Sequence, residues 1–190
     1  MNQGMKEYTI LPAIFALTMI LSAGCKSNEA NDGEANRAKE QSLHEAVQET
    51  IEVVKMRDPS LAKWFDSAHG YAVFPGIGAG GFIIGGGHGS GEVYAGGNQI
   101  GRAKVTQLNV GATFGGQVTQ QIIFFKDKFS LDSFTKSEFE FDAAASAVVI
   151  KSGAAASVDY NNGVAVFVQP KKGAMVQASL GTQKFAYTPN

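Results

Sequence analysis

The residue with the clearest chemical role is Cys25, the single cysteine in a chain of 190 residues. An uncharged apolar run over residues 10–21 precedes it, and the small residues Ala23 and Gly24 stand directly before it. This order is typical of a lipoprotein signal peptide, in which a peptidase cuts before the cysteine and the thiol receives a diacylglycerol. We therefore predict a signal peptide over residues 1–24 and a lipid anchor at Cys25. A plain secretory signal and an uncleaved anchor helix are the alternatives.

This signal also predicts where the protein resides. Acyl chains on Cys25 would hold the mature chain on a membrane, because each buried methylene contributes roughly 0.8 kcal/mol. Lys26, rather than an Asp, follows the cysteine. We therefore expect a lipid-anchored protein of the bacterial cell envelope, on the periplasmic face of the outer membrane.

Other residue patterns that could perform chemistry are weak. His44, His69 and His88 are scattered without metal-ligand spacing, and a lone cysteine excludes a disulfide framework and a Cys-rich zinc site. His88 could pair with Glu92, but a histidine on a glycine-rich strand is more often a structural donor than a general base. The sequence contains no P-loop and no nucleophile elbow. We predict no catalysis, no metal and no cofactor.

The charge composition argues against a nucleic-acid partner. The chain has 16 Lys and Arg residues against 17 Asp and Glu residues, which gives a formal net charge of −1. A nucleic-acid binder normally shows a basic face or stripe. With 44% hydrophobic and 17% charged residues, the composition is that of one globular domain.

Polar and then helical segments follow the signal. Residues 25–36 have nothing to bury and predict a flexible tether between the lipid and a single domain over residues 37–190. A helix of about 20 residues follows, with a one-sided apolar stripe formed by Leu43, Val47, Ile51 and Val54. Because its charges cancel, we interpret it as a helix packed on the domain, with a membrane-surface helix as the alternative.

A second, shorter helix begins near Asp58 and Pro59, and Trp64 lies on its inner face. A third helical turn is expected near residues 130–136, where Leu131 and Phe134 share a face.

From Gly70 onward, short β-rich runs alternate with Gly, Asn and Pro turns. We predict turns at residues 96–98, 161–163 and 171–173. The predicted fold class is α+β, mainly β: an antiparallel β-barrel or sandwich of short glycine-rich strands, preceded by N-terminal helices. Residues 70–74 also resemble residues 163–167, which is weak evidence for a duplicated hairpin.

The glycines from Gly70 to Gly91 allow three interpretations. Residues 76–81 match the dinucleotide pattern G-x-G-x-x-G, but residues 82–87 cannot open the helix that would hold a pyrophosphate. A glycine-zipper membrane helix is conceivable because residues 70–91 carry no charge, but each interior glycine costs a helix about 1 kcal/mol. We therefore favour strands, in which glycine lets a neighbouring backbone or a lipid approach closely.

An ordered series of motifs carries a family resemblance. It comprises Phe74-Pro75, Gly80-Gly81-Phe82 with Gly85-Gly86, Gly89-x-Gly91, Gly115-Gly116-Gln117, and Ala165-Val166-Phe167 with Gly173. Over about residues 46–187, this series resembles the SYLF domain, a lipid-binding family that includes a yeast actin-patch protein. The resemblance implies phospholipid binding without catalysis, with phosphoinositides preferred among eukaryotic members, some of which also bundle actin. Because this chain carries a lipoprotein signal, we expect bacterial phospholipids as its ligands.

The resulting hypothesis is a membrane-anchored, non-catalytic phospholipid-binding domain. The expected apolar contacts are Phe82, Ile83 and Ile84, where glycines leave the backbone open to an acyl chain. The candidate phosphate ligands are the basic residues Arg102, Lys104, Lys171 and Lys172, each of which could equally be a solvated surface charge.

The alternative is a structural or stress-related envelope module that binds another protein. Its surface would be the strand with Phe139 and Phe141, or the helix that carries Leu43 and Val54.

Overall fold

The computed structural model describes residues 28–81, 84–110, 117–136, 140–142, 147–172 and 182–190. The chain divides into two units, Met1–Arg37 and Ala38–Asn190, and the contacts below belong to the second unit. Helix α1 (Asn28–Arg57) is followed by α2 (Leu61–Ser67). Part of the segment predicted as a flexible tether is therefore helical from Asn28.

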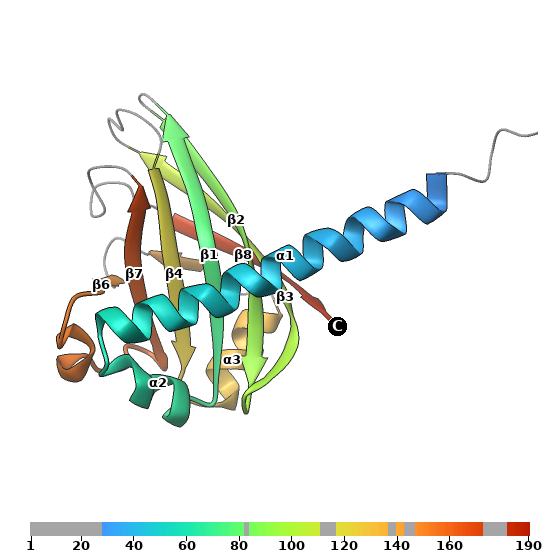
Figure 1. The fold of residues 1–190 in the computed structure, drawn as a ribbon. Helices are drawn as coiled ribbons and strands as arrows, with labels where there is room; N and C mark the ends of the chain where they lie inside the picture. The colour runs from blue at the N-terminus through green and yellow to red at the C-terminus, as the bar shows by residue number, and fades with distance from the viewer. Residues whose placement is uncertain (1–27, 82–83, 111–116, 137–139, 143–146, 173–181) are drawn as a thin grey trace, which may run out of the picture. The chain divides into compact units, whose positions relative to one another are not determined.

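Eight strands form one sheet in the order β5-β8-β3-β2-β1-β4-β7-β6 (Figure 1). They are β1 (Gly70–Gly81), β2 (Ile84–Ala95), β3 (Asn98–Val110), β4 (Gln117–Phe125), β5 (Glu140–Asp142), β6 (Ala147–Val149), β7 (Val164–Lys172) and β8 (Thr182–Pro189). All neighbours are antiparallel except β6 and β7. Two short helices, α3 (Lys128–Thr135) and η1 (Ala154–Ser157), complete the described elements.

The predicted α+β class with N-terminal helices is confirmed, and of the two predicted arrangements, barrel or sandwich, the barrel is wrong. Strands β5 and β6 stand at the two edges of the sheet and have three residues each. Within the described part of the chain, no ladder joins them, and closure requires such a ladder. The sheet is therefore open.

The sheet nevertheless curls strongly toward one face. Gln121 on β4 and Gln183 on β8 exchange hydrogen bonds of 2.8 and 2.9 Å, although β1, β2 and β3 separate their strands in the sheet order. Gln183 also donates to the side chain of Gln107 on β3, at 3.0 Å. All three amides are buried and bonded, so they form a polar layer inside the curl, as buried polar groups require.

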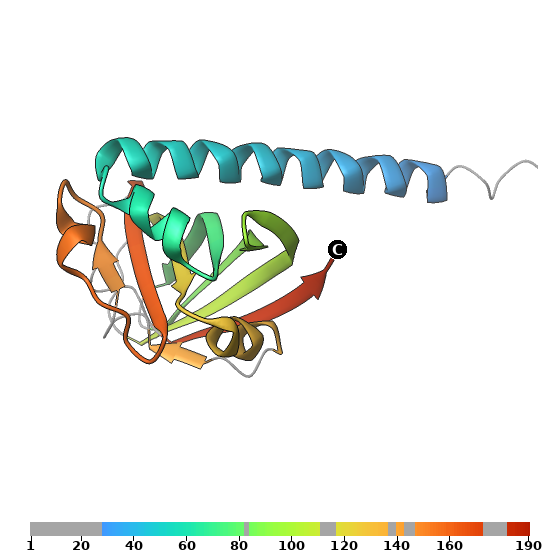
Figure 2. The same ribbon diagram turned by 90° about the horizontal axis from the view of Figure 1, so that it is seen from below.

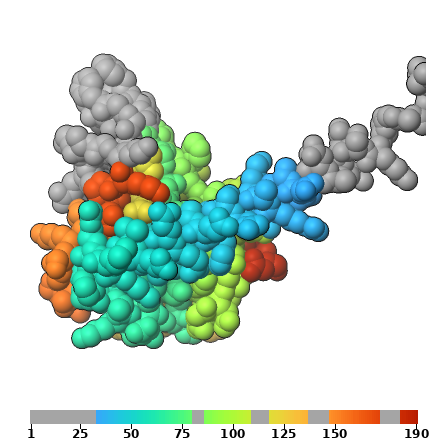
Figure 3. All heavy atoms as spheres, viewed as in Figure 1, coloured from blue at the N-terminus to red at the C-terminus, as the bar shows by residue number. Residues whose placement is uncertain are grey.

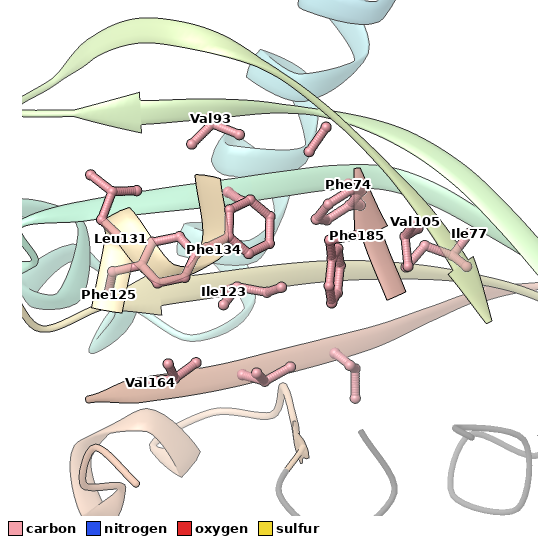
Figure 4. Packing of buried hydrophobic residues seen from close by; sticks show 14 residues of the cluster. Phe74, Ile77, Val93, Val105, Ile123, Phe125, Leu131, Phe134, Val164 and Phe185 are labelled. Atoms are coloured by element: carbon pink, nitrogen blue, oxygen red, sulfur yellow. The ribbon is translucent and has the colours of Figure 1, made fainter. Parts of the chain in front are cut away.

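The inner face of the curl holds one hydrophobic core. Alternate residues of the strands point into it, and α3 adds Leu131 and Phe134 as the sequence predicts (Figure 4). The ring of Phe134 lies 4.9 Å from that of Phe125 and 5.1 Å from that of Phe185. This core therefore joins α3 to strands from both halves of the sheet.

The opposite, outer face of the sheet packs against α2 and against residues 38–57 of α1. Figure 2 shows α1 and α2 on one side of the sheet and α3 on the other. The buried residues of this second core come from α1, α2, η1 and the outer face of the strands: Val47, Ile51, Val54, Leu61, Val73, Tyr94, Ile122, Phe124, Ile150, Ala155, Ala165 and Phe167. The stripe of α1 is thus covered by the sheet, as predicted for a packed helix, and does not provide the protein-binding surface considered as an alternative.

Glycines on the inner face of β2 are explained by the neighbouring strand. A Cβ built on Gly89 would lie 2.8 Å from the carbonyl oxygen of Gly76, and one on Gly91 would lie 2.7 Å from the ring of Phe74. A Cβ on Gly87 would meet the carbonyl oxygen of Gly78 at 3.0 Å. The glycines on the inner face therefore let β1 and β2 approach closely, which is the first of the two roles that the sequence suggested for them.

Local turn predictions are confirmed at two places and wrong at a third. Gly96 and Gly97 have φ values of +55° and +81° in the β2–β3 turn, and Asn162 and Gly163 also adopt positive φ. Lys171 belongs to β7 rather than to a turn, because β7 pairs with β4 as far as Lys172.

The internal sequence resemblance does not correspond to a structural repeat. Strands β1 and β7 flank β4, and both Ala72 and Val166 pair with Ile123. The sequence match would instead align Ala72 with the residue before Val166. This offset of one residue reverses the faces, so Phe74 lies in the inner core and Phe167 in the outer core.

Candidate functional site

Several predicted site residues lie outside what the structure can describe. Cys25, Phe82 and Ile83 are outside the described residues. Ile84 and Lys172 are the first residue of β2 and the last of β7, and only their backbone is described.

The remaining predicted cations do not form one cluster. Arg102 and Lys104 lie on the outer face of β3, whereas Lys171 is an exposed residue near the end of β7. Strands β2, β1 and β4 stand between β3 and β7. Arg102 is, in addition, ion-paired with Glu40 of α1, whereas Lys104 takes part in no ion pair between described residues.

Lys104 belongs to an uncovered part of the outer face, beyond the strand segments that α1 covers. Nine residues of β2, β3 and β8 form a three-by-three grid there, which we call the β2–β3–β8 face. The antiparallel registers align Gly86 with Leu108 and Thr182, His88 with Thr106 and Lys184, and Ser90 with Lys104 and Ala186. All nine residues are exposed, because the helices pack over a different part of the outer face.

The β2–β3–β8 face combines basic, hydroxyl and apolar groups. Its nine residues include Lys104, Lys184 and His88, three hydroxyl side chains and no carboxylate. Leu108 is 55% exposed and adds one large apolar side chain to the face. At the border of the face, Glu140 of β5 stands opposite Lys184 in the backbone register of β5 and β8. Amines and hydroxyls can bind phosphate oxygens, while Leu108 can contact apolar matter.

Sequence reasoning missed Lys184 and His88 as members of this face. The alternation of Gln183, Lys184 and Phe185 indicates that Lys184 points away from the core. No sequence signal, however, places β8 next to β3, since 71 residues lie between Val110 and Thr182.

A row of polar contacts borders this face and docks residues 38–57 of α1 on the sheet. Figure 3 shows this part of α1 lying against the rest of the domain. His44 of α1 lies 3.1 Å from the buried carboxylate of Glu92, which also accepts a 2.5 Å hydrogen bond from Tyr94. Gln48 donates to the Tyr94 hydroxyl at 3.1 Å. Burial first of all, and then the adjacent Glu92 carboxylate, raise the pKa of Tyr94 above its ordinary range. These contacts position the helix.

His88 and Glu92, whose pairing was considered from the sequence and not favoured, are not paired in the structure. Glu92 is 2% exposed and faces α1. Its partners are His44 of α1 and Tyr94, which lies on β2 like Glu92 itself. His88 is exposed and stands beside Thr106, two rows away on the same face of the sheet. The pairing fails because residues four apart on a strand are about 13 Å apart.

Asp58 organises the corner at which α1 meets α2. Its carboxylate accepts hydrogen bonds from the Ser60 amide and hydroxyl, from the Gly153 amide and from the Ala155 amide, at 2.6–3.1 Å. Burial by itself would raise the pKa of Asp58, but these hydrogen bonds outweigh it and lower the pKa from the ordinary value of 3.8. Asp58 therefore ties the turn before α2 to η1, while α2 itself begins at Leu61, directly after its N-cap residue Ser60.

The described residues form neither a candidate metal centre nor a helix that could span a membrane. No group of three or more His, Cys, Asp or Glu side chains there could hold a metal ion. None of the helices in this part of the chain is long and apolar enough to cross a bilayer.

The fold and its exposed face thus define a small α+β protein with an open, partly basic sheet surface. No family model matches the chain. The chain is similar to Beta cell expansion factor A of Aeromonas veronii, with 29% identity over 130 residues. The match covers 67% of this chain and 49% of that protein, so this chain spans about half the length of its relative.

Proposed function

We propose that the protein is a non-catalytic, lipid-anchored envelope protein that binds phospholipid membranes through its β2–β3–β8 face. The supporting observation is that face itself: nine exposed residues with two lysines, a histidine, three hydroxyls and Leu108, and no carboxylate among them. In this arrangement Lys104 and Lys184 contact phosphates of anionic lipids, and Leu108 enters the head-group layer. The signal sequence that ends at Cys25 supplies the anchor.

The β2–β3–β8 face should bind membranes weakly and in a salt-dependent manner, and the lipid anchor should compensate by holding the domain near the membrane. A lysine near an anionic membrane contributes about 1 kcal/mol, so two lysines alone give reversible binding. Acyl chains on Cys25 would keep the domain near the surface, and the local concentration would then favour contact. The SYLF resemblance is consistent with this arrangement.

The test is co-sedimentation of the purified full chain with phosphatidylglycerol-containing vesicles, in a Cys25→Ala background, so that no acyl chain holds the wild-type face or its variants on the membrane. Changing Lys104→Gln and Lys184→Gln together should weaken binding by about 25-fold, which corresponds to about 1 kcal/mol per lysine. The matched control is Lys126→Gln with Lys151→Gln, which removes two exposed lysines outside the face. Wild-type binding should fall as salt rises through the range in which surface charges are screened.

Equal binding by the face variant and the control variant would remove the β2–β3–β8 face from the proposal. Absence of vesicle binding by the wild type would contradict the proposed function as a whole.

A further inference from the structure

A shallow groove lies on the other side of α1 from the β2–β3–β8 face, between α2 and the segment after η1. It has a volume of about 210 Å³ and is lined by Lys63, Trp64, Ser67, Val158, Asp159 and Tyr160. Ligand pockets usually measure about 300–1,000 Å³. The groove therefore fits a small polar group rather than a whole lipid.

The groove has an aromatic wall. The rings of Trp64 and Tyr160 are 4.8 Å apart and tilted by 55°, and both residues are half-buried. Behind them, Trp64 packs on Phe124 and Phe167 at 5.6 and 5.1 Å. Aromatic faces attract alkylammonium groups through cation–π interaction.

Opposite charges flank this wall. Lys63 of α2 and Asp159 are both exposed groove residues, and Ser67 adds a hydroxyl. Within the described part of the chain, neither Lys63 nor Asp159 takes part in an ion pair. One cation, one anion and two aromatic rings thus border a single small space.

Hydrogen bonds of Trp64 and Asp58 fix the walls of the groove. The indole N–H of Trp64 donates to the carbonyl oxygen of Ala155 at 3.1 Å. The carboxylate of Asp58 accepts from the amides of Gly153 and Ala155, which fixes η1 against the start of α2. A ligand would therefore meet largely preformed walls, which lowers the entropic cost of binding.

We propose that this groove binds the zwitterionic head group of a phospholipid, namely a phosphate ester that carries an alkylammonium group. The ammonium group lies against Trp64 and Tyr160 and pairs with Asp159, while the phosphate contacts Lys63 and Ser67. The site is separate from the β2–β3–β8 face, and the inference rests on the proposed function only in taking a lipid as the source of the head group.

Trp64 makes a direct test possible, because it is the only tryptophan of the chain and lines the groove. The purified full chain is titrated with glycerophosphoethanolamine, with glycerol phosphate and with ethanolamine, while Trp64 fluorescence and its single indole N–H resonance are followed. The zwitterion should shift both signals in a saturable manner, and the two half-ligands should bind about fivefold more weakly or worse, as expected for losing one exposed charge contact.

Lys63→Gln and Asp159→Asn should each weaken binding of the zwitterion by about fivefold. Their matched controls are Lys151→Gln and Asp66→Asn, which change exposed residues that do not line the groove. Urea unfolding of each variant shows whether the fold is retained.

A second arm identifies the source of the head group. Vesicles with and without phosphatidylethanolamine, at equal net charge, are compared by the same Trp64 signal. A response specific to phosphatidylethanolamine supports the proposal, whereas a response to the soluble zwitterion alone assigns the groove to a free phosphate ester and overturns the lipid assignment.

Equal binding of glycerol phosphate and of the zwitterion, or no response of Trp64 to any soluble probe, overturns the groove inference. Because vesicle co-sedimentation depends on the β2–β3–β8 face, it can still succeed in that case. The two proposals therefore fail separately.

Discussion

Replacing Asp58 by Asn should destabilise the protein by about 3 kcal/mol. One carboxylate oxygen accepts from the Ser60 amide, the Ser60 hydroxyl and the Gly153 amide, and the other accepts from the Ala155 amide at 2.8 Å. An asparagine keeps one acceptor, but its NH₂ group would face the Ala155 donor. A buried donor left without a partner costs about 1–3 kcal/mol, and loss of charge weakens the other three bonds by about 0.5 kcal/mol each.

The assay is urea unfolding at pH 7, followed by the fluorescence of Trp64. This residue donates to Ala155, so it reports on the same corner of the fold. A loss of about 3 kcal/mol corresponds to a fall of about 6–12 °C in Tm for a protein of this size. Asp66→Asn on the exposed side of α2 is the matched control and should change stability by less than about 0.5 kcal/mol.

The pH dependence provides a second check with a defined sign. The pKa of Asp58 is lowered in the folded protein, so its ionised form stabilises the fold above the ordinary value of 3.8. This contribution disappears as the pH falls from 3.8 through the folded pKa, and the difference between wild type and Asp58→Asn should shrink there. A difference below about 1 kcal/mol at pH 7, or one that does not change in acid, would refute the reasoning.

Three further predictions concern the sheet, the helix contact and the anchor. Gly91→Ala should lower the free energy of unfolding by more than about 3 kcal/mol in urea and thermal assays, or prevent folding, because its Cβ would strike the backbone of β1. Gly78→Ala is the control: its Cβ meets nothing within 4 Å, so its stability should be close to that of the wild type. Glu40→Gln should strengthen binding to anionic vesicles by up to about fivefold in co-sedimentation, because it releases Arg102 beside the β2–β3–β8 face, and unchanged binding would contradict this. Cys25→Ala should move the protein from the membrane to the soluble fraction of fractionated cells, and persistent membrane association would argue against the lipid anchor.

Local patterns in the sequence were sufficient for much of the secondary structure. The stripe with Val47 and Val54 predicted a packed helix, and both residues are fully buried. Leu131 and Phe134 predicted the inner face of α3, and the glycine pair at residues 96–97 predicted a turn. These features depend on residues within a few positions of one another, so periodicity and backbone preference are enough to predict them.

Non-local contacts were beyond the reach of the sequence. Lys104 was identified as a surface cation, but its neighbour Lys184 on β8 was not, because only the pairing of β3 with β8 brings the two strands together. The separation of Lys104 from Lys171 likewise follows from strand order.

The sequence by itself determined the outward-facing lysines, the helix stripes and the glycine-rich strands, and it predicts the signal peptide before Cys25. Only the tertiary structure decided which residues share a surface: Glu92 with His44 rather than His88, Lys104 with Lys184, and Trp64 with Tyr160. The physical reason is that side-chain direction follows from local geometry, whereas neighbours across a sheet depend on strand order and on a register in which one residue of slip reverses every face.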